Sequence, residues 1–290
     1  FRFGLRLRRT LKPTLLIFGY GFIGAAFAEA ARIGGYEIAA TARTPGKRKA
    51  LMAQGLMAID PADHNALAEA IRNVEALLIT PAPDDAGCPA FAALSSFDFS
   101  GKWVGYLSTT GVYGDRNGGW VFEDSGLFPT STEGRRRVIA EDQWLSVGAQ
   151  FFRLPGLYGP GRNVIERLRD GTARRIHKPS HVFSRLHHDD CASALMASLS
   201  HPRPGGIYNL CDDEPAPADT VLEYAAALTG LPLPPVIAWD DPSLSGKMLR
   251  FYNDNKRVSN ARAKAELGWR PQYPTYREGL SAIWNDLRHK

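Results

Sequence analysis

The stretch Ile17-Phe18-Gly19-Tyr20-Gly21-Phe22-Ile23-Gly24 decides the fold of this chain. The apolar run 15–18 predicts a buried parallel strand before the glycines, and residues 25–33 predict a helix after them. In this context Gly19 permits a tight turn, Gly21 lets the backbone approach a diphosphate, and Gly24 lets the helix pack on the strand. Helix N-termini also attract anions. We therefore expect residues 19–24 to bind a dinucleotide; a glycine turn without a ligand is the alternative.

Basic residues follow the second predicted strand, 37–41, where an NAD-selective site would place a carboxylate. The segment carries Arg43, Lys47 and Arg48 and no acid. A carboxylate at this place bonds the ribose 2′-hydroxyl, whereas a guanidinium fits a 2′-phosphate. We therefore expect NADP in preference to NAD, with Arg43 as the contact. A solvated basic loop is the alternative interpretation.

The composition is that of a globular protein. The chain has 290 residues, of which 44% are hydrophobic, enough for one large domain or two smaller ones. It has no run of about 18 apolar residues, so we expect no membrane span. Its cysteines form neither a zinc pattern nor a disulfide framework, which favours a reducing compartment, the cytoplasm. They are Cys88, Cys191 and Cys211.

The net charge of +5 comes from the first residues of the chain. Residues 1–12 hold five basic residues and no acid, and the rest of the chain carries basic and acidic residues in equal number. This balance argues against nucleic-acid binding. We expect residues 1–12 to be a basic tail: an expression-vector remnant, a targeting remnant or a disordered arm.

Strand and helix patterns alternate through the first half, which predicts an α/β fold with a doubly wound parallel Rossmann sheet. Ligands bind at the carboxyl edge of such sheets. Thr80, Pro81 and Ala82 follow the fourth predicted strand there, and we expect them to contact the cofactor. Asp60 follows the third strand; it either bonds the adenine or caps a helix. The predicted strands are 56–59, 76–80, 104–107, 151–154, 182–186 and 206–210, and the predicted helices are 47–54, 65–72, 135–147, 221–229 and 260–267.

Four further motifs carry a family resemblance: Ser108-Thr109-Thr110-Gly111-Val112-Tyr113-Gly114, Leu157-Tyr158-Gly159-Pro160-Gly161-Arg162-Asn163, His187-His188-Asp189-Asp190 and Tyr208-Asn209-Leu210. With the glycine turn they make the chain resemble the extended short-chain dehydrogenase/reductases, the nucleotide-sugar epimerases and dehydratases, over 13–283. The resemblance implies an NAD(P)-binding domain of 13–155 plus 182–212. It implies a smaller, discontinuous substrate domain of 156–181 plus 213–283. It also implies a small-molecule substrate, such as a nucleotide-sugar or similar polar metabolite, and a homodimer.

The catalytic motif of that family is broken. In the family, a Tyr-x-x-x-Lys pair supplies the general acid or base and holds the nicotinamide ribose. Here Glu133 and Arg137 occupy the two places, or Thr132 and Arg136 if the alignment shifts by one. An arginine stays protonated and cannot shuttle protons. A carboxylate is a poor base near neutral pH unless burial changes its surroundings.

The remaining catalytic roles follow from the resemblance. Thr109, with Ser108, would bind the reacting oxygen, and Tyr113 would contact substrate or substitute as the acid. Arg137 would bond the ribose, and Glu133 would act as a base. Two hypotheses stay open: an NADP-linked oxidoreductase or epimerase-like enzyme, and a cofactor-binding sensor or scaffold without turnover.

Several charged residues have competing interpretations. The resemblance places Arg162, His177, Lys178 and Arg185 toward the phosphates of a nucleotide-sugar, where arginine is well suited; solvated surface is the alternative. His187-His188 beside Asp189-Asp190 suggests a metal, but successive side chains of one strand do not converge. We therefore expect no metal site, and Asp190 as the N-cap of a helix over 191–199.

Overall fold

A seven-stranded sheet in which every neighbouring pair is parallel forms the centre of the fold. The computed structural model describes residues 13–289, so the predicted tail, 1–12, lies outside the described residues. The strand order reverses between β1 and β4, as in doubly wound sheets. The predicted fold class is confirmed. Across the sheet the strands are β11 (Ile207–Asn209), β7 (Gln150–Leu154), β5 (Trp103–Thr109), β4 (Ala76–Ile79), β1 (Thr14–Phe18), β2 (Glu37–Thr41) and β3 (Met57–Ile59).

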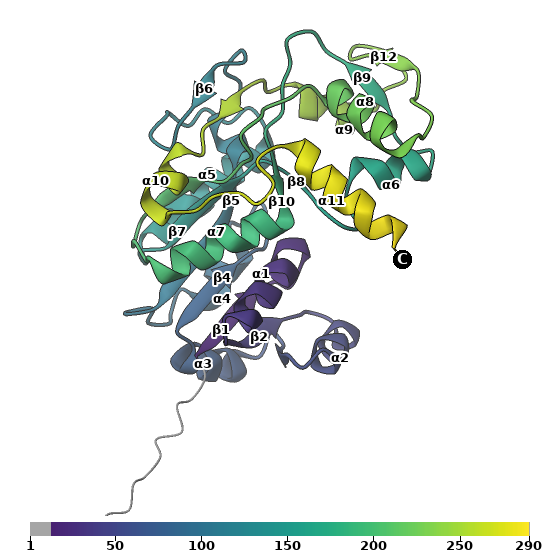
Figure 1. Cartoon of the computed structure of the whole chain (residues 1–290). Helices are drawn as coiled ribbons and strands as arrows, with labels where there is room; N and C mark the ends of the chain where they lie inside the picture. Colours follow the sequence, from purple (N-terminus) through teal and green to yellow (C-terminus); the bar gives the residue numbers. More distant parts are fainter. Residues whose placement is uncertain (1–12, 290) are drawn as a thin grey trace, which may run out of the picture.

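Helices cover both faces of this sheet (Figure 1). Successive residues of β1 point to opposite faces, so Leu15 packs in the core cluster beneath α1, α7 and α10, and Leu16 in the cluster beneath α3, α4 and α5. Among the described residues, no helix is long and apolar enough to cross a membrane. The helices around the sheet are α1 (Phe22–Ile33), α2 (Pro45–Ala53), α3 (His64–Asn73), α4 (Pro89–Leu94), α5 (Thr132–Leu145), α7 (His188–Ser200) and α10 (Ala261–Leu267).

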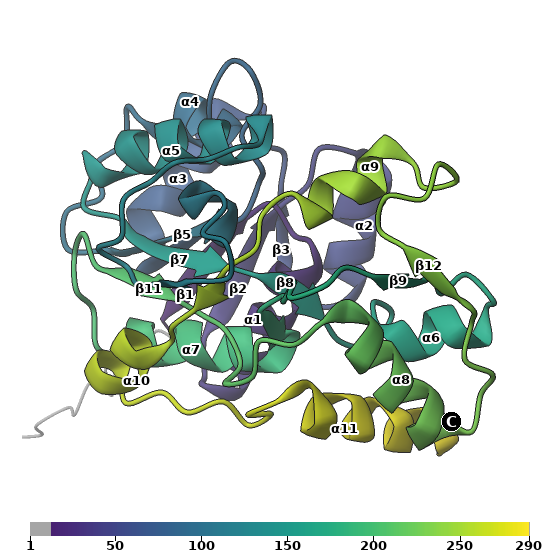
Figure 2. The ribbon, with the colours of Figure 1, turned by 90° about the horizontal axis from the view of Figure 1, so that it is seen from above.

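A second group of elements lies beyond the carboxyl ends of the strands, as the view from above shows (Figure 2). Ile165, Leu222 and Leu280 join α6, α8 and α11 in one apolar cluster. Short strands pair in parallel as β8 with β10, β9 with β12 and β6 with β13. The bounds are β6 (Trp120–Val121), β8 (Gly156–Tyr158), β9 (Arg175–His177), β10 (Arg185–His187), β12 (Val236–Ala238), β13 (Arg257–Val258), α6 (Val164–Arg169), α8 (Ala218–Thr229), α9 (Gly246–Leu249) and α11 (Tyr276–Arg288), with 3₁₀ turns η1 (Thr110–Tyr113) and η2 (Arg250–Tyr252).

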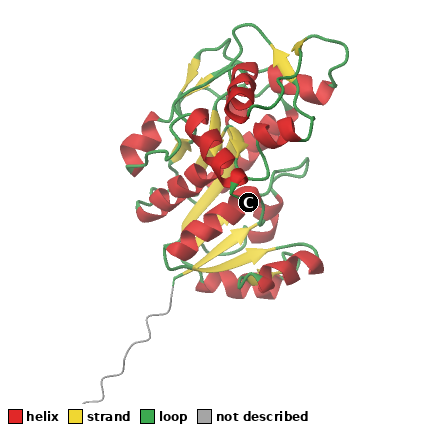
Figure 3. Ribbon diagram, turned by 45° about the vertical axis from the view of Figure 1, so that its right-hand side comes forward, coloured by secondary structure: helices red, strands yellow, loops and turns green. Residues whose placement is uncertain are grey.

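The C-terminal part differs from the sequence prediction in two ways. Residues 261–269, predicted within the substrate domain, pack against the sheet instead, because Ala263, Leu267 and Trp269 belong to the core cluster beneath α1 and α7. The helix α11, which closes the chain in Figure 3, was not predicted. Thr275 and Glu278 form a capping box at its start. That pattern marks a helix start in sequence when apolar residues follow.

A buried ion pair joins α5 to the sheet. Arg153 of β7 donates from Nη2 to Glu141 Oε2 at 2.7 Å and from Nε to Oε1 at 3.1 Å. Both side chains are buried, with 3% and 7% of their surface exposed. The remaining Arg153 nitrogen, Nη1, donates to the Tyr113 hydroxyl at 2.9 Å and to the Glu123 carbonyl at 3.0 Å. One guanidinium therefore fixes a strand, a helix and the turn η1 together.

Replacing Arg153 by Met is expected to lower the free energy of unfolding by about 3–5 kcal/mol, because Glu141 would remain buried without its partner. Urea unfolding followed by circular dichroism measures the change. Arg136→Gln, which removes the exposed Arg136–Asp85 pair of the same helix, is the control and should have little effect. Equal stability of the two variants would contradict the central role of Arg153.

Candidate functional site

The glycine turn is built by the strands around it. Gly19 has φ +91°, a conformation that favours glycine, and its N–H donates to Thr41 Oγ1 at 2.9 Å. The Thr80 hydroxyl donates to Phe18 O at 3.2 Å and to Gly19 O. A Cβ on Gly19 would lie 2.7 Å from Thr80 Oγ1. Thr80 thus holds the turn through its hydroxyl, and its predicted contact with a cofactor stays a prediction, as do those of Pro81 and Ala82.

Gly21 and Gly24 serve different purposes. A Cβ on Gly24 would lie 3.1 Å from Ile17 Cγ2, so this glycine allows α1 to pack on β1. A Cβ on Gly21 would meet no described atom within 4 Å. Gly21 is the N-cap of α1, and no side chain caps this end of the helix. The first turn therefore presents its backbone N–H groups to open space, an arrangement that suits a diphosphate.

Two of the predicted basic residues differ in role: Arg48 is held by contacts within the protein, and Arg43 is free to bind a ligand. Arg48 Nη1 donates to Ala42 O at 2.9 Å and lies 2.8 Å from Asp60 Oδ2, so it braces the end of β2. Arg43 is exposed, and its side chain has no hydrogen bond or ion pair within residues 13–289. Asp60 caps no helix, because Asp63 is the N-cap of α3. The helix-cap interpretation of Asp60 is wrong, and its contact with adenine stays a prediction.

The start of α5 holds the positions where the family has its catalytic pair. Gly134 brings this helix close to η1, since a Cβ there would lie 2.8 Å from Gly111 O. Glu133 is exposed, with Oε1 3.8 Å from Arg250 Nη1, so the burial that a carboxylate base needs is missing. Arg137 donates from Nη1 to Leu107 O and, at 3.2 Å, to the Tyr106 hydroxyl. Its predicted contact with a ribose stays a prediction.

The shifted alignment gives no better acid or base. The Thr132 hydroxyl oxygen accepts a hydrogen bond from Arg135 Nη2 at 3.1 Å. Arg136 donates from Nε to Asp85 Oδ1 at 2.9 Å. Neither alignment therefore places a tyrosine–lysine pair beside η1.

Ser108 and Tyr113, two of the three residues near β5 with predicted catalytic roles, are part of the buried Arg153–Glu141 network. Ser108 is 4% exposed and donates to Glu141 Oε1 at 2.5 Å. Tyr113 is fully buried and donates to Asn209 Oδ1 at 2.7 Å; burial raises the pKa of its phenol. Both side chains are therefore engaged in this network, and the roles expected of them, Ser108 at a reacting oxygen and Tyr113 as a substrate contact or acid, stay predictions. Thr109 is partly exposed and accepts from Gly111 N at 3.1 Å, which leaves its hydroxyl hydrogen to donate.

A cavity of 790 Å³ lies between α6, α8, α11 and the β8–β10 pair. Four arginines line it: Arg162, Arg167, Arg174 and Arg185. Of the residues predicted to face a phosphorylated substrate, the structure brings Arg162 and Arg185 here. Lys178 does not line this cavity; its ammonium donates to Tyr252 O and lies over the Trp239 ring, 4.4 Å from the centroid. His177 pairs with Asp219 at 2.6 Å.

Comparison with known proteins agrees with the geometry. No protein-family model matches the chain. A functionally unknown conserved protein from Silicibacter pomeroyi DSS is 45% identical, with a TM-score of 0.89, over 94% of this chain and 99% of its own. A dTDP-glucose 4,6-dehydratase from Bacillus anthracis, solved with NAD, has a TM-score of 0.77 at 18% identity, over 96% and 97% of the two chains. At this identity the likeness shows a shared fold: the chain has the fold of the dTDP-glucose 4,6-dehydratase.

Two more proteins are similar to this chain, one in structure and one in sequence. A human epimerase family protein, solved with NADPH, has a TM-score of 0.75 at 17% identity, over 94% of this chain and 99% of its own. A 3-diazoavenalumate denitrifying reductase from Streptomyces sp is 36% identical over 162 residues. That match spans 50% of this chain and 51% of the curated relative. Because the chain keeps the glycine turn and lacks Tyr-x-x-x-Lys, it is an atypical example of the fold.

Asp212, a buried acid next to Arg185 of the cavity wall, was not predicted from the sequence. Asp212 is 2% exposed, and neither carboxyl oxygen has a hydrogen-bond partner in the described structure. Loss of solvation raises its pKa to about 8, although the nearby Arg185 guanidinium opposes the shift. The hydroxyls of Tyr158 and Tyr276, both on the cavity wall, are also buried without partners. Below about pH 8 Asp212 is therefore a protonated carboxyl group behind this wall, next to Arg185.

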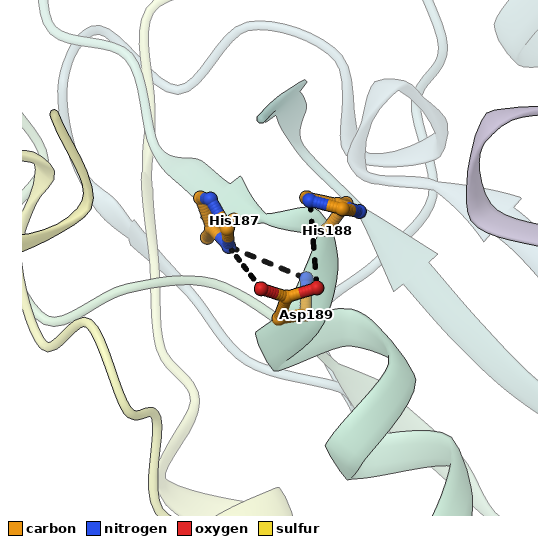
Figure 4. A group of neighbouring side chains, drawn as sticks. All are labelled: His187, His188 and Asp189. Carbon is orange, nitrogen blue, oxygen red and sulfur yellow. Dashed lines mark hydrogen bonds and ion pairs between the residues drawn. The ribbon is translucent and has the colours of Figure 1, made fainter. Parts of the chain in front are cut away.

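His187, His188 and Asp189 come together where β10 passes into α7 (Figure 4). Asp189 Oδ2 lies 3.6 Å from His187 Nδ1, and Oδ1 lies 3.4 Å from His188 Nε2. The expectation that these side chains would not converge is wrong, because the strand ends at His187 and the helical turn redirects the next two residues. His187 Nδ1 accepts the Asp189 N–H at 3.3 Å and so caps α7. This capping role explains how His187 and Asp189 come together, and the expectation of no metal site stays a prediction.

Asp190 is not the N-cap that the sequence suggested, because α7 already begins at His188. Its carboxylate instead accepts the N–H groups of Gln272, at 2.5 Å, and Tyr273, at 3.1 Å. Asp190 thus ties the segment before α11 to the start of α7.

Asp212 should make stability depend on pH with a defined sign. Its pKa is raised in the folded protein, so its contribution is complete below its ordinary value of 3.8 and is lost as the pH rises to about 8. The free energy of unfolding of the wild type, minus that of Asp212→Asn, should therefore fall across this range. Urea unfolding at a series of pH values measures the difference. The exposed Asp286→Asn is the control, and a rising difference for Asp212→Asn would contradict the assignment.

Proposed function

We propose that this protein is an NADP-linked reductase that binds the dinucleotide at residues 19–24 and its acceptor in the adjoining cavity. The observation that carries the proposal is Gly21: its missing side chain is required by no neighbour, and the uncapped N-terminus of α1 faces the space it leaves. This cradle fits a diphosphate. The exposed Arg43 would then bind the 2′-phosphate.

The acceptor is proposed to need no proton from a tyrosine. When bound, NADPH supplies a hydride, and an aryl diazonium ion that takes it up releases N₂ and becomes an arene without protonation of any oxygen. The name of the half-length relative, a 3-diazoavenalumate denitrifying reductase, describes a diazo substrate and a reduction. A chain with Glu133 and Arg137 in place of Tyr-x-x-x-Lys suits such an acceptor, since it lacks the tyrosine that protonates a reacting oxygen in the family.

Other substrates and roles remain distinct candidates. Arg162 and Arg185 on the cavity wall favour an anionic acceptor, which includes a nucleotide-sugar. An epimerase would need a group that removes and returns protons, and the buried Tyr113 does not offer one. A cofactor-binding sensor is the alternative to an enzyme, favoured by the absent catalytic pair. A homodimer and a cytoplasmic location complete the proposal; the latter rests on the three cysteines, all free and buried.

The turnover test follows the absorbance of NADPH with a panel of acceptors that contains an aryl diazonium acid, simple ketones and a nucleotide-sugar. The proposal expects oxidation of NADPH with the diazonium acid and release of N₂. Gly21→Ala should raise the Kd for NADPH at least about tenfold, because its methyl group occupies the cradle. Gly46→Ala, at another open position, is the control. Tight binding of NADPH without turnover of any acceptor would support the sensor instead.

Arg43→Ala should weaken NADPH by about ten- to a hundredfold and leave NADH unchanged, because only NADPH carries the 2′-phosphate. Titration calorimetry with both nucleotides measures the preference. The exposed Lys49→Ala on α2 is the matched control. An unchanged ratio of the two affinities in Arg43→Ala would contradict the NADP assignment.

A further inference from the structure

Arg162 lies on a turn that several hydrogen bonds hold in place. Gly159 and Arg162 exchange backbone hydrogen bonds of 3.1 and 3.0 Å across Pro160 and Gly161. Asn163 holds the turn from inside, since Nδ2 donates to Gly159 O at 3.0 Å while Oδ1 caps α6. The Gly161 N–H donates to Glu166 Oε1 at 3.0 Å. These bonds fix the backbone from which the Arg162 side chain extends.

The Arg162 side chain reaches the first residue of α1. Its guanidinium carbon lies 5.5 Å from the centroid of the Phe22 ring, and the same ring stacks on His188 at 5.1 Å. Phe22 opens the helix whose N–H groups form the cradle beside Gly21. Arg162 is exposed, and its guanidinium has no hydrogen bond or ion pair within residues 13–289. It is therefore a cation without an anion, held next to the proposed diphosphate site.

This placement is electrostatically unfavourable as it stands. The N-terminus of a helix carries a partial positive charge, which repels a guanidinium beside it, whereas the face of the Phe22 ring attracts it. An anion between Arg162 and the first turn of α1 would turn both charges into favourable partners. Arginine is well suited to that task because it can donate two parallel hydrogen bonds to a phosphate group.

We propose that Arg162 binds the diphosphate of the dinucleotide from the side opposite to the glycine turn. This assignment rests on the proposed function and differs from the sequence prediction, which directed Arg162 to a substrate phosphate. Arg162 also lines the 790 Å³ cavity, so the residue that closes over the cofactor belongs to the wall of the acceptor site. Binding of the dinucleotide would thereby hold the Arg162 side chain at one side of that cavity.

The test compares Arg162→Gln and Arg162→Lys with the wild type by titration calorimetry against NADPH, NADH and adenosine 2′-monophosphate. Arg162→Gln should raise the Kd of both dinucleotides by the same factor, about tenfold or more, since both contain the diphosphate. Arg162→Lys should lose less. Adenosine 2′-monophosphate, which has no diphosphate, should bind all three proteins equally. Arg169→Gln, an exposed arginine of α6 outside the cavity wall, is the control and should match the wild type.

Each other result overturns the assignment. Unchanged dinucleotide binding in Arg162→Gln, with a raised KM for the acceptor, would return Arg162 to the substrate. Equal weakening of adenosine 2′-monophosphate would show a general loss at the site rather than a diphosphate contact. A wild type that binds neither NADPH nor NADH would overturn the proposed function itself, and is recognised without any variant. Melting temperatures of the variants within a few degrees of the wild type confirm that the protein is folded.

Discussion

The ion pair between Arg153 and Glu141 is the constraint on which the region around β5 depends. A buried arginine must have every donor satisfied, and here it is satisfied by a helix, a turn and a loop at once. Tyr113 accepts a hydrogen bond from this arginine and Ser108 donates to Glu141, so both residues belong to the same buried network. Thr109, next to Ser108 at the carboxyl end of β5, is partly exposed and keeps its hydroxyl hydrogen to donate.

The two halves of the site, the glycine turn and the start of α5, differ in what they retain. The turn from Gly19 to Gly24 has the geometry that suits a diphosphate. It includes Gly21, at which no described neighbour would be met by a side chain. The start of α5, in contrast, offers an exposed carboxylate and an arginine folded back on Leu107. Hydride chemistry needs the first half in any case, whereas an acid is needed only when the acceptor becomes an alkoxide. The combination therefore limits the chemistry more sharply than either half does alone.

Local patterns in the sequence were enough for the sheet and its glycine turn, because an apolar run, three glycines and a helix are contiguous. Residues that depend on distant partners were beyond such reasoning. The run Phe151-Phe152-Arg153-Leu154 was predicted only as a strand, and the pairing of Arg153 with Glu141 was not foreseen. Asp212 gave no signal, since only the packed structure shows that solvent is excluded from it. Asp190 was read as a local cap, and its partners lie 82 and 83 residues further along the chain.

The tether from Asp190 to residues 272–273 has a consequence for the order in which the protein is made. The last strand of the sheet ends at Asn209, so the dinucleotide turn and its supports precede the C-terminal quarter of the chain. The residues of α11, which form part of the cavity wall, follow α7 in the chain, and the segment before α11 binds Asp190 of α7. During synthesis from the N-terminus, the glycine turn and the strands of the central sheet are therefore complete as sequence before this wall of the cavity exists.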